Sequence, residues 1–133
     1  MRKIRILAAL SIDGFYVPLK LQESYGIAFS EYDSFYKDVN FILKDMDGYQ
    51  ELQKSEENFE GKVILVIGNN RKLISYLLLR NLITDITVCT FPVWLGKGKR
   101  LFPVISNQNS KWETKERHFY DSGVTIVRYQ KCN

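Results

Sequence analysis

The stretch that most constrains the fold is residues 61–103, in which two apolar runs flank a polar turn and an amphipathic segment. Residues 63–67 are an unbroken, mostly β-branched apolar run, which is typical of a strand covered on both faces. Leucines and isoleucines then recur at helical spacing as far as Leu82. Residues 86–91 predict a second strand, which Pro92 ends. A strand, a helix and a strand in this order predict parallel strands joined by a right-handed crossover.

The turn inside this unit is a candidate anion site. Gly68 and Asn69 tolerate a positive φ, and Asn69 or Asn70 is expected to cap the helix. Ligands of open α/β sheets bind beyond the carboxyl ends of the strands, where a helix N-terminus attracts anions. We therefore expect residues 68–72 to receive an anion. The alternative is a plain capped helix start, at which Arg71 and the lysine after it are solvated.

Bulk composition indicates one ordinary globular domain, residues 1–133, with 45% hydrophobic and 26% charged residues. A net charge of +4 permits an anionic ligand but does not require nucleic acid, and no dense basic stripe is present. Cys89 and Cys132 lack the spacing of a metal or redox site, so no metal is expected. No signal peptide pattern and no apolar run of transmembrane length occurs, so we expect a cytoplasmic protein without a membrane partner.

The remaining segments predict a sheet of about six strands. Residues 4–10 are apolar except for Arg5 and are expected to be central in the sheet. Asn81 is expected directly after the C-terminus of the long helix. The other predicted elements are a loop over 15–25, a short helix with a face from Tyr32 to Val39, strands near 40–44, 85–91, 111–120 and 124–131, a polar turn at 45–48, and a brief helix over 49–55.

Four segments carry a family resemblance. They are ILAALSIDG at 6–14, VIGN at 66–69, the pair LITD at 82–85 and FPVWLGKG at 91–98 followed by LFP, and the hairpin at 122–129. In this order they resemble the dihydrofolate reductase-like superfamily, and most closely the C-terminal reductase domain of riboflavin biosynthesis. The resemblance implies a three-layer α-β-α fold with a mostly parallel sheet that ends in an antiparallel hairpin.

The resemblance also implies an activity and a set of site residues. The activity is NADPH-dependent reduction of a pteridine or pyrimidine-type substrate by a homodimer. Asp13 would assist at the substrate as the catalytic residue, although a turn-forming aspartate is an equal alternative. The substrate would lie beside Ser11, Asp13, Gly96, Lys97, Gly98 and Lys99. The cofactor would lie beside Ala9, Tyr49, Gly68, Asn69, Asn70 and Arg71.

Three departures from the family pattern weaken the expected NADPH site. Asp45, Met46 and Asp47 stand where the family has a glycine and an arginine before the tyrosine at position 49. A phosphate that approached either carboxylate closely would lose on the order of a few kcal/mol. Asn69 replaces the second glycine of the family pair. The short connector 50–60 replaces two strands, which truncates one sheet edge.

The sequence therefore leaves two main functions open. One is the NADPH-dependent reductase. The other is a catalytically degenerate, dimeric small-ligand-binding or structural protein that keeps the scaffold. A third, a weak anion or nucleic-acid binder, would use Arg71, Lys72, Lys97, Lys99 and Arg100, and nucleic acid is not the expected partner.

Several aromatic and basic side chains have both a functional and a packing interpretation. Phe15, Tyr16 and Tyr25 either line a pocket for a flat heterocycle or pack in a loop. Trp94 and Trp112 are interpreted as core or dimer-contact residues. No triad or metal set accompanies the single histidine, His118, which we expect at the surface.

Overall fold

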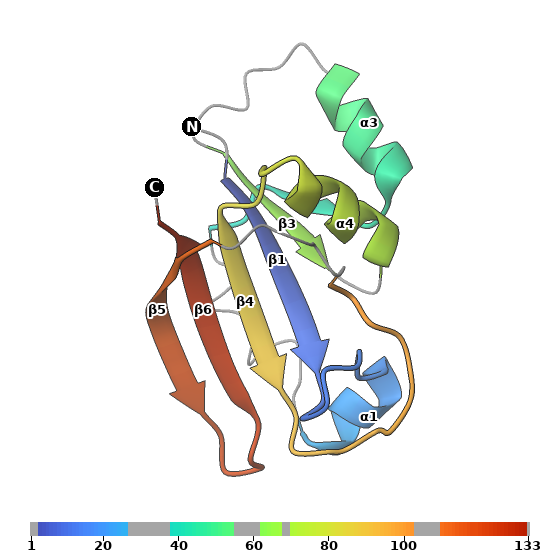
Figure 1. The fold of residues 1–133 in the computed structure, drawn as a ribbon, viewed down its shortest axis with the longest axis vertical. Helices are drawn as coiled ribbons and strands as arrows, with labels where there is room; N and C mark the ends of the chain where they lie inside the picture. The colour runs from blue at the N-terminus through green and yellow to red at the C-terminus, as the bar shows by residue number, and fades with distance from the viewer. Residues whose placement is uncertain (1–2, 27–37, 55–61, 68–69, 103–109, 133) are drawn as a thin grey trace.

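The fold is a six-stranded sheet with helices packed against it (Figure 1). The computed structural model of the chain describes residues 3–26, 38–54, 62–67, 70–102 and 110–132. The sheet has the order β2-β3-β1-β4-β6-β5. The strands are β1 (Lys3–Leu10), β2 (Phe41–Leu43), β3 (Val63–Ile67), β4 (Asp85–Thr90), β5 (Trp112–Phe119) and β6 (Thr125–Lys131), and the helices are α1 (Leu19–Ser24), α3 (Met46–Lys54) and α4 (Arg71–Leu79).

The predicted strand directions are confirmed. Strands β2, β3, β1 and β4 run parallel, whereas β6 pairs antiparallel with both β4 and β5. The β3-α4-β4 unit differs from the prediction in one respect, because its two strands are not neighbours. Strand β1 lies between them, with Ile6 opposite Val66 on one side and Ile86 on the other. An apolar strand such as β1 is most stable where a neighbour flanks it on each side and both faces are covered.

The two faces of β1 contribute to two separate apolar clusters. Ile4, Ile6 and Ala8 point toward α3 and α4, where they meet an apolar stripe on α4. Figure 1 shows α3 and α4 on the same face of the sheet. Leu7 and Ala9 point the other way, into a cluster that α1 helps to cover. Sequence alternation along one strand thus supplies both halves of the core.

Two local predictions differ from the structure. Residues 15–25 were expected as a loop, but residues 19–24 form helix α1, whose N-cap position is Pro18. Proline fixes φ near −65° and lacks an amide hydrogen, which suits the start of a helix. The polar turn expected at 45–48 is instead the first turn of α3, because the Asp45 side chain caps that helix. The short helix expected between Tyr32 and Val39 falls mostly outside the described residues.

Helix α4 has the caps that the sequence predicts. The Leu73 amide donates to Asn70 Oδ1 at 2.9 Å, so Asn70 is the N-cap. At the other end Asn81 has a φ of 60°, the left-handed conformation expected just beyond a helix. The Asn81 amide donates to the carbonyl oxygen of Leu78, and the Leu82 amide to that of Leu77. These bonds satisfy carbonyl groups that the end of a helix leaves unpaired.

A buried ion pair lies between β1 and β4 on the face that α1 helps to cover. The Arg5 side chain is 5% exposed and that of Asp85 is 1% exposed, and Arg5 Nε lies 3.6 Å from Asp85 Oδ2. The two terminal nitrogens of Arg5 donate to both carboxylate oxygens of Asp38 at 3.1 and 3.2 Å. These hydrogen bonds, and then the charge of Arg5, lower the pKa of Asp38 against the desolvation that would raise it. Arg5 therefore joins β4 and the segment before β2 to the central strand.

We predict that Arg5→Met destabilises the fold by about 3–5 kcal/mol, because the substitution leaves the Asp85 carboxylate buried without a compensating charge. Urea unfolding followed by circular dichroism measures the loss. The double variant Arg5→Met/Asp85→Leu removes both charges and should be more stable than Arg5→Met alone. A double variant less stable than the single one would contradict the coupling.

Candidate functional site

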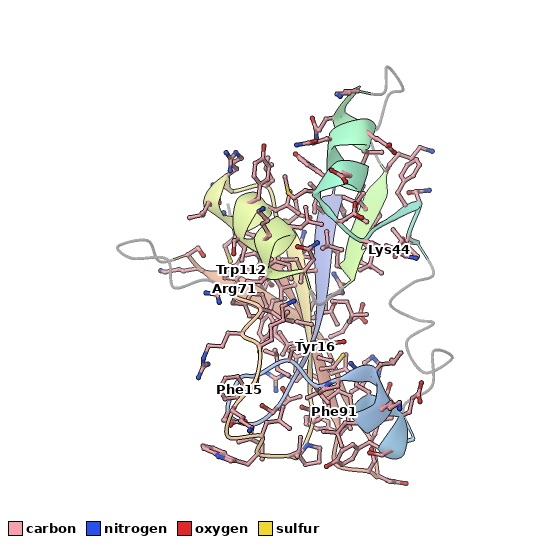
Figure 2. The ribbon with its side chains drawn as sticks, turned by 90° about the vertical axis from the view of Figure 1, so that its right-hand side faces the viewer. Phe15, Tyr16, Lys44, Arg71, Phe91 and Trp112 are labelled. Atoms are coloured by element: carbon pink, nitrogen blue, oxygen red, sulfur yellow. The ribbon has the colours of Figure 1, made fainter. Side chains whose placement is uncertain are left out.

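The candidate site lies at the carboxyl ends of the parallel strands, which three polar segments follow. One segment follows β1, a second follows β2 and opens α3, and a third follows β4 as a glycine-rich loop. Figure 2 shows Phe15, Tyr16 and Phe91 gathered at one end of the sheet, with Lys44 and Arg71 farther along it. Gly68 and Asn69, which follow β3, lie outside the described residues.

Asp13 holds the loop after β1 against the loop after β4. Its carboxylate accepts hydrogen bonds from Ser11 Oγ at 2.6 Å, from the Leu95 amide at 3.1 Å and from the Gly96 amide at 2.7 Å. Desolvation would raise the pKa of Asp13, but the bonds from Ser11, Gly96 and Leu95 outweigh it and hold the pKa below its usual value of 3.8. The carboxylate is therefore ionised at neutral pH and positions backbone.

Ser11 is part of the same arrangement. It is buried, and its hydroxyl also accepts from the Phe15 amide at 3.0 Å while its own amide donates to the Phe15 carbonyl at 2.8 Å. The structure thus brings together three of the predicted substrate residues, Ser11, Asp13 and Gly96. Their observed contacts are those of a tight, mutually hydrogen-bonded turn.

The glycine-rich loop packs on the residues after β1. The Tyr16 amide donates to the Lys99 carbonyl at 2.7 Å. The Arg100 guanidinium lies over the Phe15 ring, 4.3 Å from its centre, in cation–π geometry. Gly98 has a φ of 149°, and a side chain there would come within 3.4 Å of Phe15 Cβ. A Cβ would make only ordinary contact there, so it is the backbone conformation that favours glycine at position 98.

Lys97 and Lys99 project from this loop into solvent. The role of Arg100 was not assigned from the sequence, although an arginine near several aromatic residues is a signal for ring stacking. Tyr25, for which the sequence left a pocket and loop packing open, packs edge-on against Phe91 with ring centres 5.7 Å apart. Burial raises the pKa of Tyr16. Of the three aromatic side chains considered, Phe15 and Tyr25 are thus engaged in packing.

The N-terminus of α3 is capped by the side chain of Asp45. The Gly48 amide, in the first turn of α3, donates to Asp45 Oδ1 at 2.8 Å. Asp47 adds a second carboxylate to the same turn. An acidic side chain at a helix N-terminus is favourable because it offsets the partial positive charge of the free amides. The sequence showed these aspartates only as obstacles to a phosphate, whereas an aspartate directly before a helix is also a capping signal.

The start of α4 is capped in a similar way. Asn70 accepts from the Leu73 amide through Oδ1, and its Nδ2 donates to the Lys44 carbonyl at 3.2 Å. Asn70 thereby connects the first turn of α4 to the end of β2. Arg71 and Lys72 are exposed at the beginning of this helix. Two cations there oppose the helix dipole and leave the surface attractive to an anion.

The other two predicted cofactor residues lie within apolar clusters. Tyr49 is 6% exposed, and its ring packs edge-on against Tyr76 with centres 5.6 Å apart. Ala9 is buried beside Cys89, and its carbonyl accepts from the Val17 amide at 3.0 Å. Both residues support the elements around the site, and their described contacts are with the protein itself.

The described residues do not fit a cofactor phosphate at the start of α3. The Gly48 amide is already bonded to a carboxylate, and a phosphate would lie beside two aspartates. Within the described ranges no group of three metal-ligating side chains comes together. Among those residues, no helix is long and apolar enough to cross a membrane.

Comparison with solved structures identifies the architecture. The chain superimposes on RibD from Acinetobacter baumannii with a TM-score of 0.67 at 11% identity, over 99% of this chain and 58% of that one. It superimposes on a pyrimidine reductase-like protein from Corynebacterium diphtheriae with a TM-score of 0.64 at 10% identity, over 98% of this chain and 92% of that one. The chain has the dihydrofolate reductase-like fold.

A third solved structure is similar over nearly the whole chain. It is a diaminohydroxyphosphoribosylaminopyrimidine deaminase/5-amino-6-(5-phosphoribosylamino)uracil reductase from Thermotoga maritima, with a TM-score of 0.64 at 10% identity over 98% of this chain. The chain spans 56% of the length of that protein. No protein-family model matches the chain, and no curated protein matches it significantly. The predicted relationship is thus confirmed at the level of the fold.

The lowered pKa of Asp13 predicts a pH dependence of stability. An aspartate whose pKa is lower in the folded state stabilises the fold above its unfolded pKa, and this contribution is lost as pH falls through the folded pKa. The stability difference between the protein and Asp13→Asn should therefore be full above about pH 4 and decrease in more acidic solution. Urea unfolding of both proteins from pH 7 to pH 3 measures it. A difference that stays constant over this range would contradict the role of the ionised carboxylate.

Proposed function

We propose that this protein is a catalytically degenerate small-ligand-binding protein built on a reductase scaffold. The observation that carries the proposal is the hydrogen bond from the Gly48 amide to Asp45, which places a carboxylate of the chain where a cofactor phosphate would be received. The sequence supports it independently, because the arginine that the resemblance leads us to expect there is replaced by acidic residues.

The negative charge at the start of α3 disfavours binding of a dinucleotide phosphate there. A phosphate at the start of α3 would have to displace the Asp45 carboxylate and then remain close to both Asp45 and Asp47. Displacement would remove a helix cap, which is typically worth about 1 kcal/mol. Repulsion between like charges would add to this loss, more strongly where water is excluded. The lost helix cap and the repulsion between like charges therefore both disfavour NADPH binding through this turn.

The ligand that fits the remaining features is a small anion or a flat heterocycle. Arg71 and Lys72 supply positive charge at one side, and Lys97 and Lys99 supply it on the glycine-rich loop. Asp13 fixes the backbone of that loop, so its geometry does not depend on a ligand. A small anion needs only a few such groups and does not have to reach the acidic turn of α3.

A second candidate is the NADPH-dependent reductase of a pteridine or pyrimidine-type substrate. The observation that favours it is the likeness of nearly the whole chain to reductase structures. In that case Asp13 and the loop from Gly96 to Lys99 would lie beside the substrate, and Asn70 and Arg71 would face the cofactor. The cofactor would supply the hydride, and the chain would supply position and charge.

Titration with NADPH distinguishes the two candidates. We expect no saturable change in nicotinamide fluorescence and no rise in melting temperature at millimolar NADPH, because Asp45 occupies the α3 amide. The variant Asp45→Ser/Asp47→Asn retains a capping side chain and removes both charges, so it should bind inorganic pyrophosphate more tightly than the unmodified protein. Saturation of the unmodified protein at micromolar NADPH would favour the reductase.

We also propose that the protein is a homodimer in solution. Trp94, which lies on the loop after β4, is 69% exposed, and exposed tryptophan side chains are common at the centres of protein interfaces. If Trp94 lies in the dimer contact, Trp94→Ala should shift the mass measured by light scattering toward that of the monomer. Phe119→Ala is the matched control, because Phe119 is an aromatic side chain of similar exposure, 74%, on β5. A monomer before substitution would exclude the dimer.

A further inference from the structure

An apolar cavity of about 300 Å³ opens on the sheet face that carries α3 and α4. Its lining comes from four separate segments, with Ile86 and Val88 on β4, Phe102 on the chain after β4, Trp112 on β5 and Tyr129 on β6. The sheet register explains why these side chains meet. Ile86 is opposite Tyr129, Val88 follows Ile86 on the same face, and Trp112 is two residues before the partner of Tyr129 on β5.

The cavity is separate from the site described above. Ile86 is the second residue of β4, so the cavity lies toward the amino end of that strand, whereas Asp13 and the glycine-rich loop lie beyond its carboxyl end. Figure 2 shows Trp112 well apart from Phe15 and Phe91 along the length of the molecule. An occupant of this cavity would therefore not compete with a ligand beside Asp13 and the glycine-rich loop.

The chemistry of the lining selects an uncharged ligand. None of the five described lining residues is an aspartate, glutamate, lysine, arginine or histidine, and three of them are aromatic. The indole nitrogen of Trp112 donates to Ser110 Oγ at 2.9 Å, which satisfies its one donor and fixes the ring. A charged group over these apolar side chains would find no oppositely charged partner among the described lining residues. A flat aromatic molecule would instead gain apolar contact and ring stacking.

The size of the cavity favours a small molecule over a second copy of the chain. A volume near 300 Å³ is at the lower end of the range found for small-molecule pockets, about 300–1,000 Å³. A stable dimer interface needs roughly 20–30 residues from each partner, whereas five of the described residues line this cavity. We propose that this cavity binds a small, uncharged aromatic molecule at a second site, independent of the function proposed for the carboxyl ends of the strands.

The first test uses Trp112 as the reporter. The variant Trp94→Phe leaves Trp112 as the only tryptophan, and Trp94 lies on the exposed loop outside the cavity. The probe is N-phenyl-1-naphthylamine, an uncharged aromatic dye whose fluorescence rises in apolar surroundings. We expect saturable binding of one dye per chain, with energy transfer from Trp112. Absence of saturable binding, or binding without energy transfer, would overturn the proposal.

A matched pair of substitutions locates the binding site. Ile86→Phe fills the cavity. Ile42→Phe makes the same change on β2, which is the edge strand farthest from β5, and Ile42 is 49% exposed. We expect Ile86→Phe to weaken dye binding at least about tenfold, because the larger ring occupies the space of the ligand. Ile42→Phe should leave the affinity unchanged. Equal affinities in the two variants would contradict the assignment.

Two further outcomes name other occupants, and each would overturn the proposal. If Trp112 in the dye-free Trp94→Phe variant is inaccessible to acrylamide, the chain itself fills the cavity. If self-association measured by light scattering is lost in Ile86→Phe but kept in Ile42→Phe, a second copy covers it. Should Ile86→Phe fail to fold, Val88→Phe makes the cavity-filling change at the other β4 residue of the lining.

Discussion

Burial of β1 between two parallel neighbours is the constraint on which the rest of the structure depends. Its register with β3 and β4 brings the carboxyl ends of the strands to one edge of the sheet. Its alternating side chains divide the core into the two clusters on either face. The one charged residue of its interior, Arg5, is compensated by carboxylates from two other segments. A substitution in this strand therefore affects the core on one face or on the other, according to its position.

The edge of the sheet that would serve as an active site is stabilised mainly by contacts within the chain. Asp13 receives three hydrogen bonds, two of them from the loop after β4, and Asp45 and Asn70 each accept a hydrogen bond from a first-turn amide of α3 and α4 respectively. Each of these side chains could in principle serve a ligand. In this protein each instead satisfies backbone groups that would otherwise need water or an anion. The chain therefore stabilises this edge of the sheet with its own side chains. Two of its structural neighbours carry names that describe a reductase or a reductase-like protein.

The antiparallel hairpin adds a surface that the parallel part of the sheet does not have. Strands β6 and β5 extend the sheet beyond β4, and their apolar face continues past α4 to form the cavity with Trp112 and Tyr129. Strand β5 is itself an outer edge, and its exposed charges and the register shift at Lys115 are features that discourage further strand pairing. The two edges of the sheet thus differ in chemistry as well as in length.

The sequence by itself determined the six strands, the caps of α4 and the resemblance in fold, because periodicity, asparagine at helix ends and short motifs are local signals. It could not show that β1 lies between β3 and β4, or that Asp13 bonds to Leu95 and Gly96. Each of these facts depends on which distant segments meet, and pattern within one segment carries no information about that. Only the tertiary structure decided whether the acidic residues near the carboxyl ends of the strands were available to a ligand or already hydrogen-bonded to the chain.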